Sequence, residues 1–510
     1  MLLSLAMIVK NEEETLAHCL ESVKPIVDEM VIVDTGSTDR TVEIAEEFGG
    51  SVHHFQWCDD FAAARNESLK HCSGQWALII DADEAIDPLD YEKIKNACIN
   101  PIADAYMLIS RSYFYDSLHL SRTDAAVPNT SPYSEGRHLP FYADSPALRL
   151  ARMHDGLAFS SSIHESLHTS LRDSGKTIEN LDAVLHHYGS LFKDREEHKT
   201  HYYLMLASKE AEKNPHSMHA HSNVMQQAMK AKMWDLALRS ADACIRISPR
   251  VDIYVLYGRA MALQELGRHE EALQQLDSLL AQVPDYAPAQ LLGAISFAQL
   301  GDLDLGRRAA QRAISLQPNL AQAYMCLADW DIKENKMDAA IKTLADALKI
   351  APSEPRFYNQ LISIELGEAN YSNAAKIAAQ ALKACPIERN GNWESVIFQY
   401  SSKMAEHELA MGNLDSARQE ALSGLESLPN EPRLYDILIK IETQRGNMQR
   451  AAQDAIKGIQ SCPEGNPLWY RLAAAYLSQV GERQTAKSIL DLGLKAFPND
   501  PDLLKLVGIV

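Results

Sequence analysis

The chain has 510 residues, a formal net charge of −20 and a hydrophobic fraction of 46%. Its length allows at least two domains, and its charge argues against non-specific nucleic-acid binding, because phosphates would repel the protein. The eight cysteines form no Cys-x-x-Cys pair and are predicted to be reduced thiols of a cytoplasmic protein. No apolar run of about 18 residues predicts a transmembrane segment, and residues 1–9 are interpreted as a first strand rather than a secretion signal.

Short apolar runs alternate with a helical pattern through the first 90 residues. Strands are predicted at 1–9, 30–33, 51–55 and 76–80, and a helix at 61–71. This alternation indicates an open α/β sheet with parallel strands, which binds ligands beyond the carboxyl ends of its strands. The polar residues that follow three of these runs are therefore expected to converge on one crevice, namely Asn11, Asp34, Asp81 and Asp83.

The most distinctive of these strand ends is Asp81-Ala82-Asp83-Glu84. Like charges packed this closely repel, and a bound cation commonly neutralises them. Mg²⁺ and Mn²⁺ prefer oxygen ligands and often bridge a carboxylate to a substrate phosphate. An isolated Asp-x-Asp is more often a solvated turn, so the prediction of a site depends on the neighbouring strand ends.

Residues 1–90 resemble the nucleotide-sugar-binding half of family two glycosyltransferases, which have the GT-A fold. The matching segments are 7–12, 31–39 and 81–83, and segment 55–66 is similar to a subgroup fused to tetratricopeptide repeats. The resemblance continues through 148–150, 163–165 and 187–189. It implies a GT-A-like α/β domain, with a Rossmann-like open sheet, over residues 1–195.

The resemblance also implies roles for individual positions. The residues expected to bind the nucleotide sugar are Val9, Asn11, Glu12, Asp34, Ser37, Arg65, Asp81 and Ala82. A divalent ion, Mn²⁺ or Mg²⁺, is expected on Asp81 and Asp83, with His164 as a third ligand because imidazole commonly binds metals. A UDP-sugar is the donor expected first, although Thr35 stands where many relatives have an acid that contacts the base.

Two acids compete for the role of catalytic base, which must remove the proton of an acceptor hydroxyl. Glu165 is the first candidate and Glu84 the second, while Asp144 is a weaker one. Structural alternatives stay open: Glu165 fits the first turn of a helix, and His164 fits a hydrogen-bonded core histidine.

Residues 112–146 fit the strand–helix pattern least well, because four prolines prevent a long helix there. A loop of this length in a compact domain is usually functional or disordered. The segment is predicted to be a wall or lid of the acceptor site.

An internal repeat begins near residue 196. Prolines recur every 34 or 35 residues, except for one interval of 43, at Pro215, Pro249, Pro284, Pro318, Pro352, Pro386, Pro429, Pro463 and Pro498. Small residues recur in the same phase at Ala237, Ala272, Gly306, Ala340, Ala374, Ala417, Ala451 and Ala486. This pattern predicts an all-α tetratricopeptide (TPR) solenoid over 196–510, with about eight repeats and an inserted loop near 387–395.

The sequence therefore predicts a metal-dependent, inverting glycosyltransferase of the hexosyl type that acts on a peptide or protein presented by the solenoid. Such solenoids offer a concave surface for a partner, and a homo-oligomer is a second use of that surface. Two other functions stay open: an inactive nucleotide-binding scaffold, and a transferase for a polysaccharide or lipid-linked acceptor.

Overall fold

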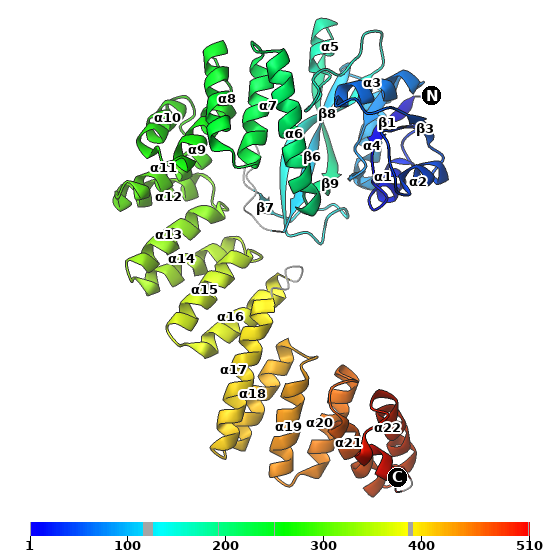
Figure 1. The fold of residues 1–510 in the computed structure, drawn as a ribbon, viewed down its shortest axis with the longest axis vertical. Helices are drawn as coiled ribbons and strands as arrows, with labels where there is room; N and C mark the ends of the chain where they lie inside the picture. The colour runs from blue at the N-terminus through cyan, green and yellow to red at the C-terminus, as the bar shows by residue number, and fades with distance from the viewer. Residues whose placement is uncertain are drawn as a thin grey trace. The chain divides into compact units, whose positions relative to one another are not determined.

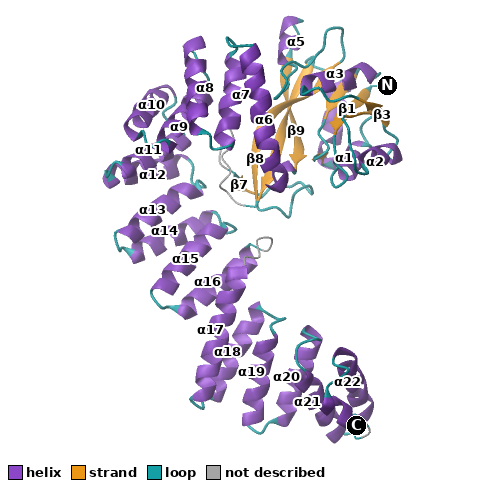
Figure 2. Ribbon diagram, viewed as in Figure 1, coloured by secondary structure: helices purple, strands orange, loops and turns teal. Residues whose placement is uncertain are grey.

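The structure is a computed structural model that describes residues 2–115, 126–191, 193–248, 250–385, 391–507 and 509 (Figure 1). The chain forms two compact units, Met1–Ala351 and Pro352–Val510. The first unit contains the described strands together with the first helical repeats, and the second contains helices (Figure 2).

The sheet has the order β3-β2-β1-β4-β8-β6-β9-β5, with β7 beside β8. Its strands are β1 (Leu3–Val9), β2 (Glu29–Asp34), β3 (Ser51–His54), β4 (Trp76–Ile79), β5 (Glu84–Ile86), β6 (Ala105–Phe114), β7 (Val127–Pro128), β8 (Phe141–Arg152) and β9 (Ile178–His187). The pairs β1–β2, β1–β4 and β2–β3 are parallel, which confirms the predicted parallel α/β arrangement of the first four strands.

Helices cover both faces of this sheet, because alternate side chains of a strand point to opposite sides. They are α1 (Leu16–Val23), α2 (Thr41–Glu47), α3 (Phe61–His71), α4 (Tyr91–Ile99) and α5 (His168–Asp173), with short 3-10 turns η1 (Pro88–Asp90) and η2 (Gly189–Leu191). Leu5 and Met7 of β1 belong to the core that includes residues of α1, α2 and α4. Ala6, between them, belongs to the core with α3 and α5.

The prediction of a loop over 112–146 is wrong at both ends. Residues 112–114 belong to β6 and 141–146 to β8, and these two strands pair along their whole length. Strand β8 pairs with β7 at one end and with β4 at the other, but around Pro146 its only partner among the described strands is β6. The other edge of β8 has no partner at Pro146, so no N–H donor is required on that edge and a proline is tolerated. Residues 116–125 of the predicted lid lie outside the described residues.

The repeat region confirms the predicted solenoid. In the first unit its helices are α6 (Lys193–Lys213), α7 (Met218–Lys230), α8 (Trp234–Ile247), α9 (Ile253–Glu265), α10 (His269–Gln282), α11 (Ala287–Gln299), α12 (Leu303–Leu316), α13 (Ala321–Lys333) and α14 (Met337–Ile350). In the second unit they are α15 (Pro355–Gly367), α16 (Tyr371–Ala384), α17 (Gly391–Ala410), α18 (Leu414–Ser427), α19 (Pro432–Gln444), α20 (Met448–Ser461), α21 (Pro467–Gln479), α22 (Arg483–Ala496) and α23 (Pro501–Leu506). From α7 to α22 the described helices form eight consecutive pairs, the number predicted.

The two sequence markers of the repeat have clear structural roles. The small residues of the predicted register are buried, so they permit close approach of the paired helices. The described prolines of the series lie in turns between helices, whereas Pro249 and Pro386 lie outside the described residues. The interval of 43 residues includes residues 386–390, also outside the description, and α17, which has 20 residues where α15 and α19 have 13. The predicted insertion near 387–395 is therefore partly an extension of a helix.

The change from mixed structure to helices alone occurs at α6, close to the predicted boundary between 195 and 196. The compact units divide instead after Ala351, because the first repeat helices pack against the α/β region. The boundary between residues 195 and 196 therefore stays a prediction as a division between two domains.

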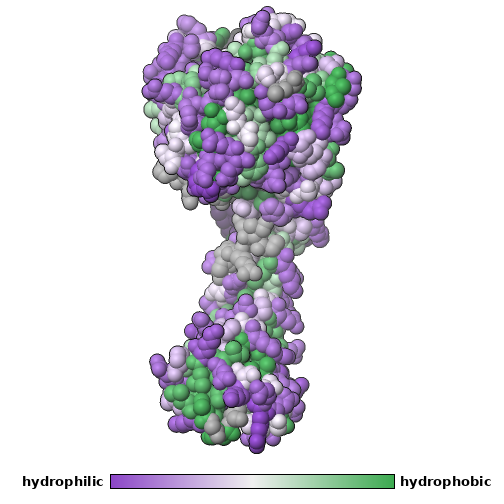
Figure 3. Space-filling view, turned by 90° about the vertical axis from the view of Figure 1, so that its right-hand side faces the viewer, coloured by the Kyte–Doolittle hydropathy of each residue, from purple (hydrophilic) through white to green (hydrophobic). Residues whose placement is uncertain are grey.

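Hydrophobic side chains gather on the surface of the second unit, in the lower part of Figure 3. Within this unit, four apolar side chains are each more than half exposed, namely Val480, Leu492, Leu504 and Val507. The described part of the chain contains no helix long and apolar enough to cross a membrane. The predicted homo-oligomer and the predicted cytoplasmic location are tested by neither observation and stay predictions.

Candidate active site

The register of the parallel strands brings their polar ends to one edge of the sheet. Val9 of β1 is opposite Asp34 of β2, and Ala6 of β1 is opposite Ile79 of β4. The residues that follow β1, β2 and β4 therefore lie at the same edge, the expected ligand-binding position in such a sheet.

At the ends of β1 and β2, the predicted nucleotide-binding residues join two loops. Asn11, with φ of +54°, accepts a hydrogen bond from Thr38 N–H at 2.7 Å, and its own N–H donates to Ser37 Oγ at 3.0 Å. The Asp34 carboxylate is buried and accepts from the N–H groups of Gly36 and Ser37 at 3.2 and 3.0 Å. These bonds hold the first turn of the edge in one conformation.

Val9, Thr35 and Glu12 complete this part of the site. The Val9 carbonyl accepts from both the N–H and the hydroxyl of Thr35, each at 3.0 Å. Glu12 N–H donates to Thr41 Oγ1 at 2.7 Å. The Thr35 hydroxyl is thus bonded to the backbone of β1 and supports the turn.

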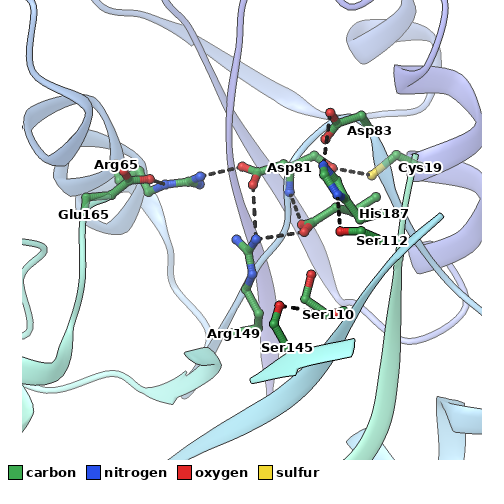
Figure 4. A network of polar contacts seen from close by, with 11 residues as sticks. Cys19, Arg65, Asp81, Asp83, Ser110, Ser112, Ser145, Arg149, Glu165 and His187 are labelled. Carbon is green, nitrogen blue, oxygen red and sulfur yellow. Dashed lines mark hydrogen bonds and ion pairs between the residues drawn. The ribbon is translucent and has the colours of Figure 1, made fainter. Parts of the chain in front are cut away.

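Asp81 lies between two arginines (Figure 4). Arg65, on α3, pairs with Asp81 and also with Glu165, whereas Arg149, on β8, pairs with Asp81 at 3.2 Å and with Glu84 at 2.8 Å. Burial raises the pKa of Asp81, but both guanidiniums lower it more, so the carboxyl stays ionised. The ion pairs therefore fix Asp81 as a carboxylate.

Glu84 faces the interior of the domain. It is 2% exposed, and its carboxylate accepts from Asp81 N–H and from Arg149, both at 2.8 Å. Burial raises its pKa to about 7. The Glu165 side chain is more accessible, with 14% exposed, and Asp144 makes a two-bond pair with Arg111. Of the three acids named as bases, Glu84 is therefore the least accessible, and the role of Glu165 stays a prediction.

Asp83 lies beside His187, a histidine that was not predicted as a ligand. His187 Nε2 is 3.6 Å from Asp83 Oδ2, and its Nδ1 is 2.9 Å from Ser112 Oγ, which orients the ring. Burial lowers the pKa of His187, but the hydrogen bond to Asp83 and the charges of Asp83, Glu84 and Asp81 together raise it above its usual value. The pairing of β5 with β9 produces this contact, because it places Glu84 opposite His187.

Gly189 packs closely against both of these side chains. A Cβ atom at this position would lie 2.6 Å from His187 Nε2 and closer still to Asp83 Oδ2. Gly189 therefore allows the backbone to approach Asp83 and His187 closely without a clash.

His164, the predicted third ligand, points elsewhere. Its side chain is exposed, and its Nε2 lies 2.9 Å from the side-chain nitrogen of Gln227 on α7. Within the described ranges, no three His, Cys, Asp or Glu side chains are already grouped as a metal site. The set of Asp81, Asp83 and His164 is thus not gathered, Ala82 is buried in the turn between the two acids, and the ligand set stays a prediction.

Comparison with known proteins finds similarity in both parts of the chain. Residues 4–153 match the model of glycosyl transferase family 2, and residues 257–321 match a tetratricopeptide repeat model. The chain is therefore similar to family 2 glycosyltransferases over residues 4–153 and to tetratricopeptide repeat proteins over residues 257–321.

Three relatives illustrate this similarity. A TPR repeat-containing protein of Synechococcus elongatus is 43% identical over 21% of this chain and 26% of its own length. An uncharacterized glycosyltransferase of Rickettsia bellii is 28% identical over 38% of this chain and 67% of its own length. Glycosyltransferase SunS of the SPbeta prophage in Bacillus subtilis is 29% identical over 31% of this chain and 33% of its own length. The chain thus spans about a quarter of the first relative and a third of the last.

Proposed function

We propose that the chain is a metal-dependent glycosyltransferase that moves a sugar from a nucleoside diphosphate sugar to an acceptor presented by the repeats. A peptide or protein is the acceptor class we favour, and a UDP-sugar is the first donor to test. The observation that supports this function is the gathering of Asp81, Asp83, Arg65 and Arg149 at the carboxyl ends of parallel strands. It lies in the segment that matches family 2.

The two arginines can serve the departing diphosphate. Arg65 Nη1 and Arg149 Nε are buried and lack a hydrogen-bond partner among the described residues. Each is therefore a donor that a phosphate oxygen can satisfy, with a charge-assisted bond. A buried donor without a hydrogen-bond partner costs about 1–3 kcal/mol of stability, and a bound phosphate oxygen would recover that free energy.

The residues present also fit a divalent cation. Asp81, Asp83, Glu84 and Glu165 supply four carboxylates against the two guanidiniums, so the cluster has a net charge of −2 when all four are ionised. Asp83 and His187 would hold the ion beside Gly189, with the carboxylate as the ligand type that suits Mn²⁺. The bound ion would neutralise charge on the diphosphate as the glycosidic bond breaks.

Glu165 is proposed as the base. Its carboxylate would take the proton of the acceptor hydroxyl as the hydroxyl oxygen attacks the anomeric carbon. A single displacement of this kind inverts the configuration at that carbon. Arg65, which pairs with both Glu165 and Asp81, would keep base and donor site at a constant separation.

The function is tested by incubating the full chain with a panel of nucleoside diphosphate sugars, with and without Mn²⁺. We expect slow release of free sugar that depends on Mn²⁺, because water replaces a missing acceptor. Nucleotide binding without sugar release for every donor and metal would reject the enzyme and favour the inactive scaffold.

Gly189→Ala tests the metal position. The added methyl group would displace Asp83 or His187, and we expect Mn²⁺ affinity to fall about 10- to 100-fold. Isothermal titration of Mn²⁺ measures the change. Gly367→Ala is the matched control, because a Cβ at Gly367 would meet nothing within 4 Å. Equal Mn²⁺ affinity in both variants would place the metal elsewhere.

A further inference from the structure

The candidate base Glu165 lies on a tight loop, residues 160–166. Ser160 and Ser166 close the loop with two backbone hydrogen bonds of 3.1 Å. Within it, Ser161 and His164 have φ of +80° and +49°, in the left-handed region that non-glycine residues seldom adopt. Such a backbone persists only where surrounding contacts determine it.

The surrounding contacts come largely from helices of the repeat region. On α6, the Glu210 carboxylate accepts from Ser162 N–H at 3.1 Å and from Ser162 Oγ at 2.7 Å. On the opposite side, the Ser162 carbonyl accepts from Phe61 N–H at 3.0 Å. One residue of the loop is thus bonded to both the repeat helix and the glycosyltransferase domain.

The next two residues continue this contact. Ile163 is 3% exposed and belongs to a core made mostly by α6, α7 and the helices after them, including Ala207 and Val224. His164 lies against Gln227 of α7, which is 1% exposed. The loop therefore lies on two repeat helices immediately before the position of Glu165.

Helix α6 also contacts α3, the helix that carries Arg65. Tyr203 packs edge-on against Phe61, with ring centroids 5.6 Å apart. Burial raises the pKa of its hydroxyl to about 12, and the charges of Asp81 and Glu165 add to this rise. The helix that opens the repeat region thus packs against the start of the helix that carries Arg65.

From these contacts we infer that α6 and α7 position the catalytic base: Glu210 and Gln227 are positioning residues that fix loop 160–166, and the repeats therefore contribute to turnover as well as to acceptor binding. This inference rests on the proposed function for its kinetic part, since Glu165 must act as the base. Its structural part concerns the loop alone and is measurable without any substrate.

The test compares Glu210→Ala, Glu210→Gln and Gln227→Leu in the full chain. Glu212→Ala is the matched control, because Glu212 is an exposed acid on the same helix. Hydrogen–deuterium exchange of the peptide covering 160–166 reports on the loop, and donor hydrolysis gives kcat. Titration with UDP and Mn²⁺ gives nucleotide affinity.

We expect Glu210→Ala and Gln227→Leu to raise exchange of this peptide roughly tenfold, because bonds that fix the loop are lost. In both, kcat should fall about 10- to 100-fold with unchanged nucleotide affinity. Glu210→Gln keeps an acceptor oxygen for Ser162, so its loop exchange and its kcat should both lie close to those of the wild type. Loop exchange and kcat equal to those of Glu212→Ala would overturn the inference, as would a loss of kcat matched by an equal loss of nucleotide affinity. Wild-type protein without turnover would reject the proposed function, whereas loop exchange would still decide whether the helices hold the loop.

Discussion

Glu165→Gln is expected to lower donor hydrolysis about a thousandfold, within the range that general-base catalysis contributes. The amide keeps an oxygen that accepts from Arg65, so the loop and the ion pair between Arg65 and Asp81 should remain in place. Nucleotide affinity should therefore change little while kcat falls. Steady-state hydrolysis and nucleotide titration on the same preparations separate the two quantities.

Two matched substitutions show whether this effect is specific. Glu179→Gln changes an exposed glutamate of β9 and should leave kcat unchanged. Glu84→Gln tests the competing base, and we expect a smaller loss of kcat accompanied by a lower unfolding temperature, because Glu84 is a buried partner of Arg149. If Glu84→Gln abolished turnover while Glu165→Gln preserved it, the base would be Glu84.

The parts of the fold that depend on short-range pattern were predictable. The short apolar run 76–80 predicts a buried strand, and β4 spans Trp76–Ile79, just before the acids. Helix α3 spans Phe61–His71, the range predicted, with Asp60 as its N-cap. The repeats were predictable because the same small residue has to recur wherever two helices cross closely.

The parts that depend on long-range pairing were not predictable in the same way. The pairing of β6 with β8 joins residues such as Ser112 and Ala143, and a local reading of the intervening prolines indicates a loop. The same holds for the histidines. His164 stands beside an acid in sequence, whereas His187 meets Asp83 only through the pairing of β5 with β9.

The contribution of the repeat helices to the site was also absent from the prediction, for a similar reason. A period of 34 residues reveals that helices stack on each other, but it carries no information on what the first of them contacts. Trp57 illustrates the point: its Nε1–H donates to Tyr202 of α6 at 2.6 Å, an interaction across 145 residues. Such contacts are specified by the docked surfaces rather than by any local motif.

Removal of divalent metal is expected to abolish donor hydrolysis, and Asp83→Asn should lower Mn²⁺ affinity and kcat each by at least about a hundredfold. Charge on the departing diphosphate would then lack several kcal/mol of stabilisation. Chelation followed by addition of Mn²⁺ or Mg²⁺ measures the requirement, and electron paramagnetic resonance of Mn²⁺ measures the affinity. His187→Gln should resemble Asp83→Asn, because both side chains lie beside Gly189.

His164→Gln provides the decisive contrast. The sequence predicts His164 as the third ligand, yet its ring lies against Gln227. We therefore expect His164→Gln to retain the Mn²⁺ affinity of the wild type, whereas a loss equal to that of Asp83→Asn would restore the sequence prediction. Asp155→Asn, at an exposed aspartate, controls for the removal of a carboxylate. Asp83 and His187 meet through the pairing of β5 with β9, whereas His164 lies on the loop that packs on α6 and α7. Asp83→Asn and His187→Gln therefore test metal binding, and His164→Gln tests the loop that positions the base.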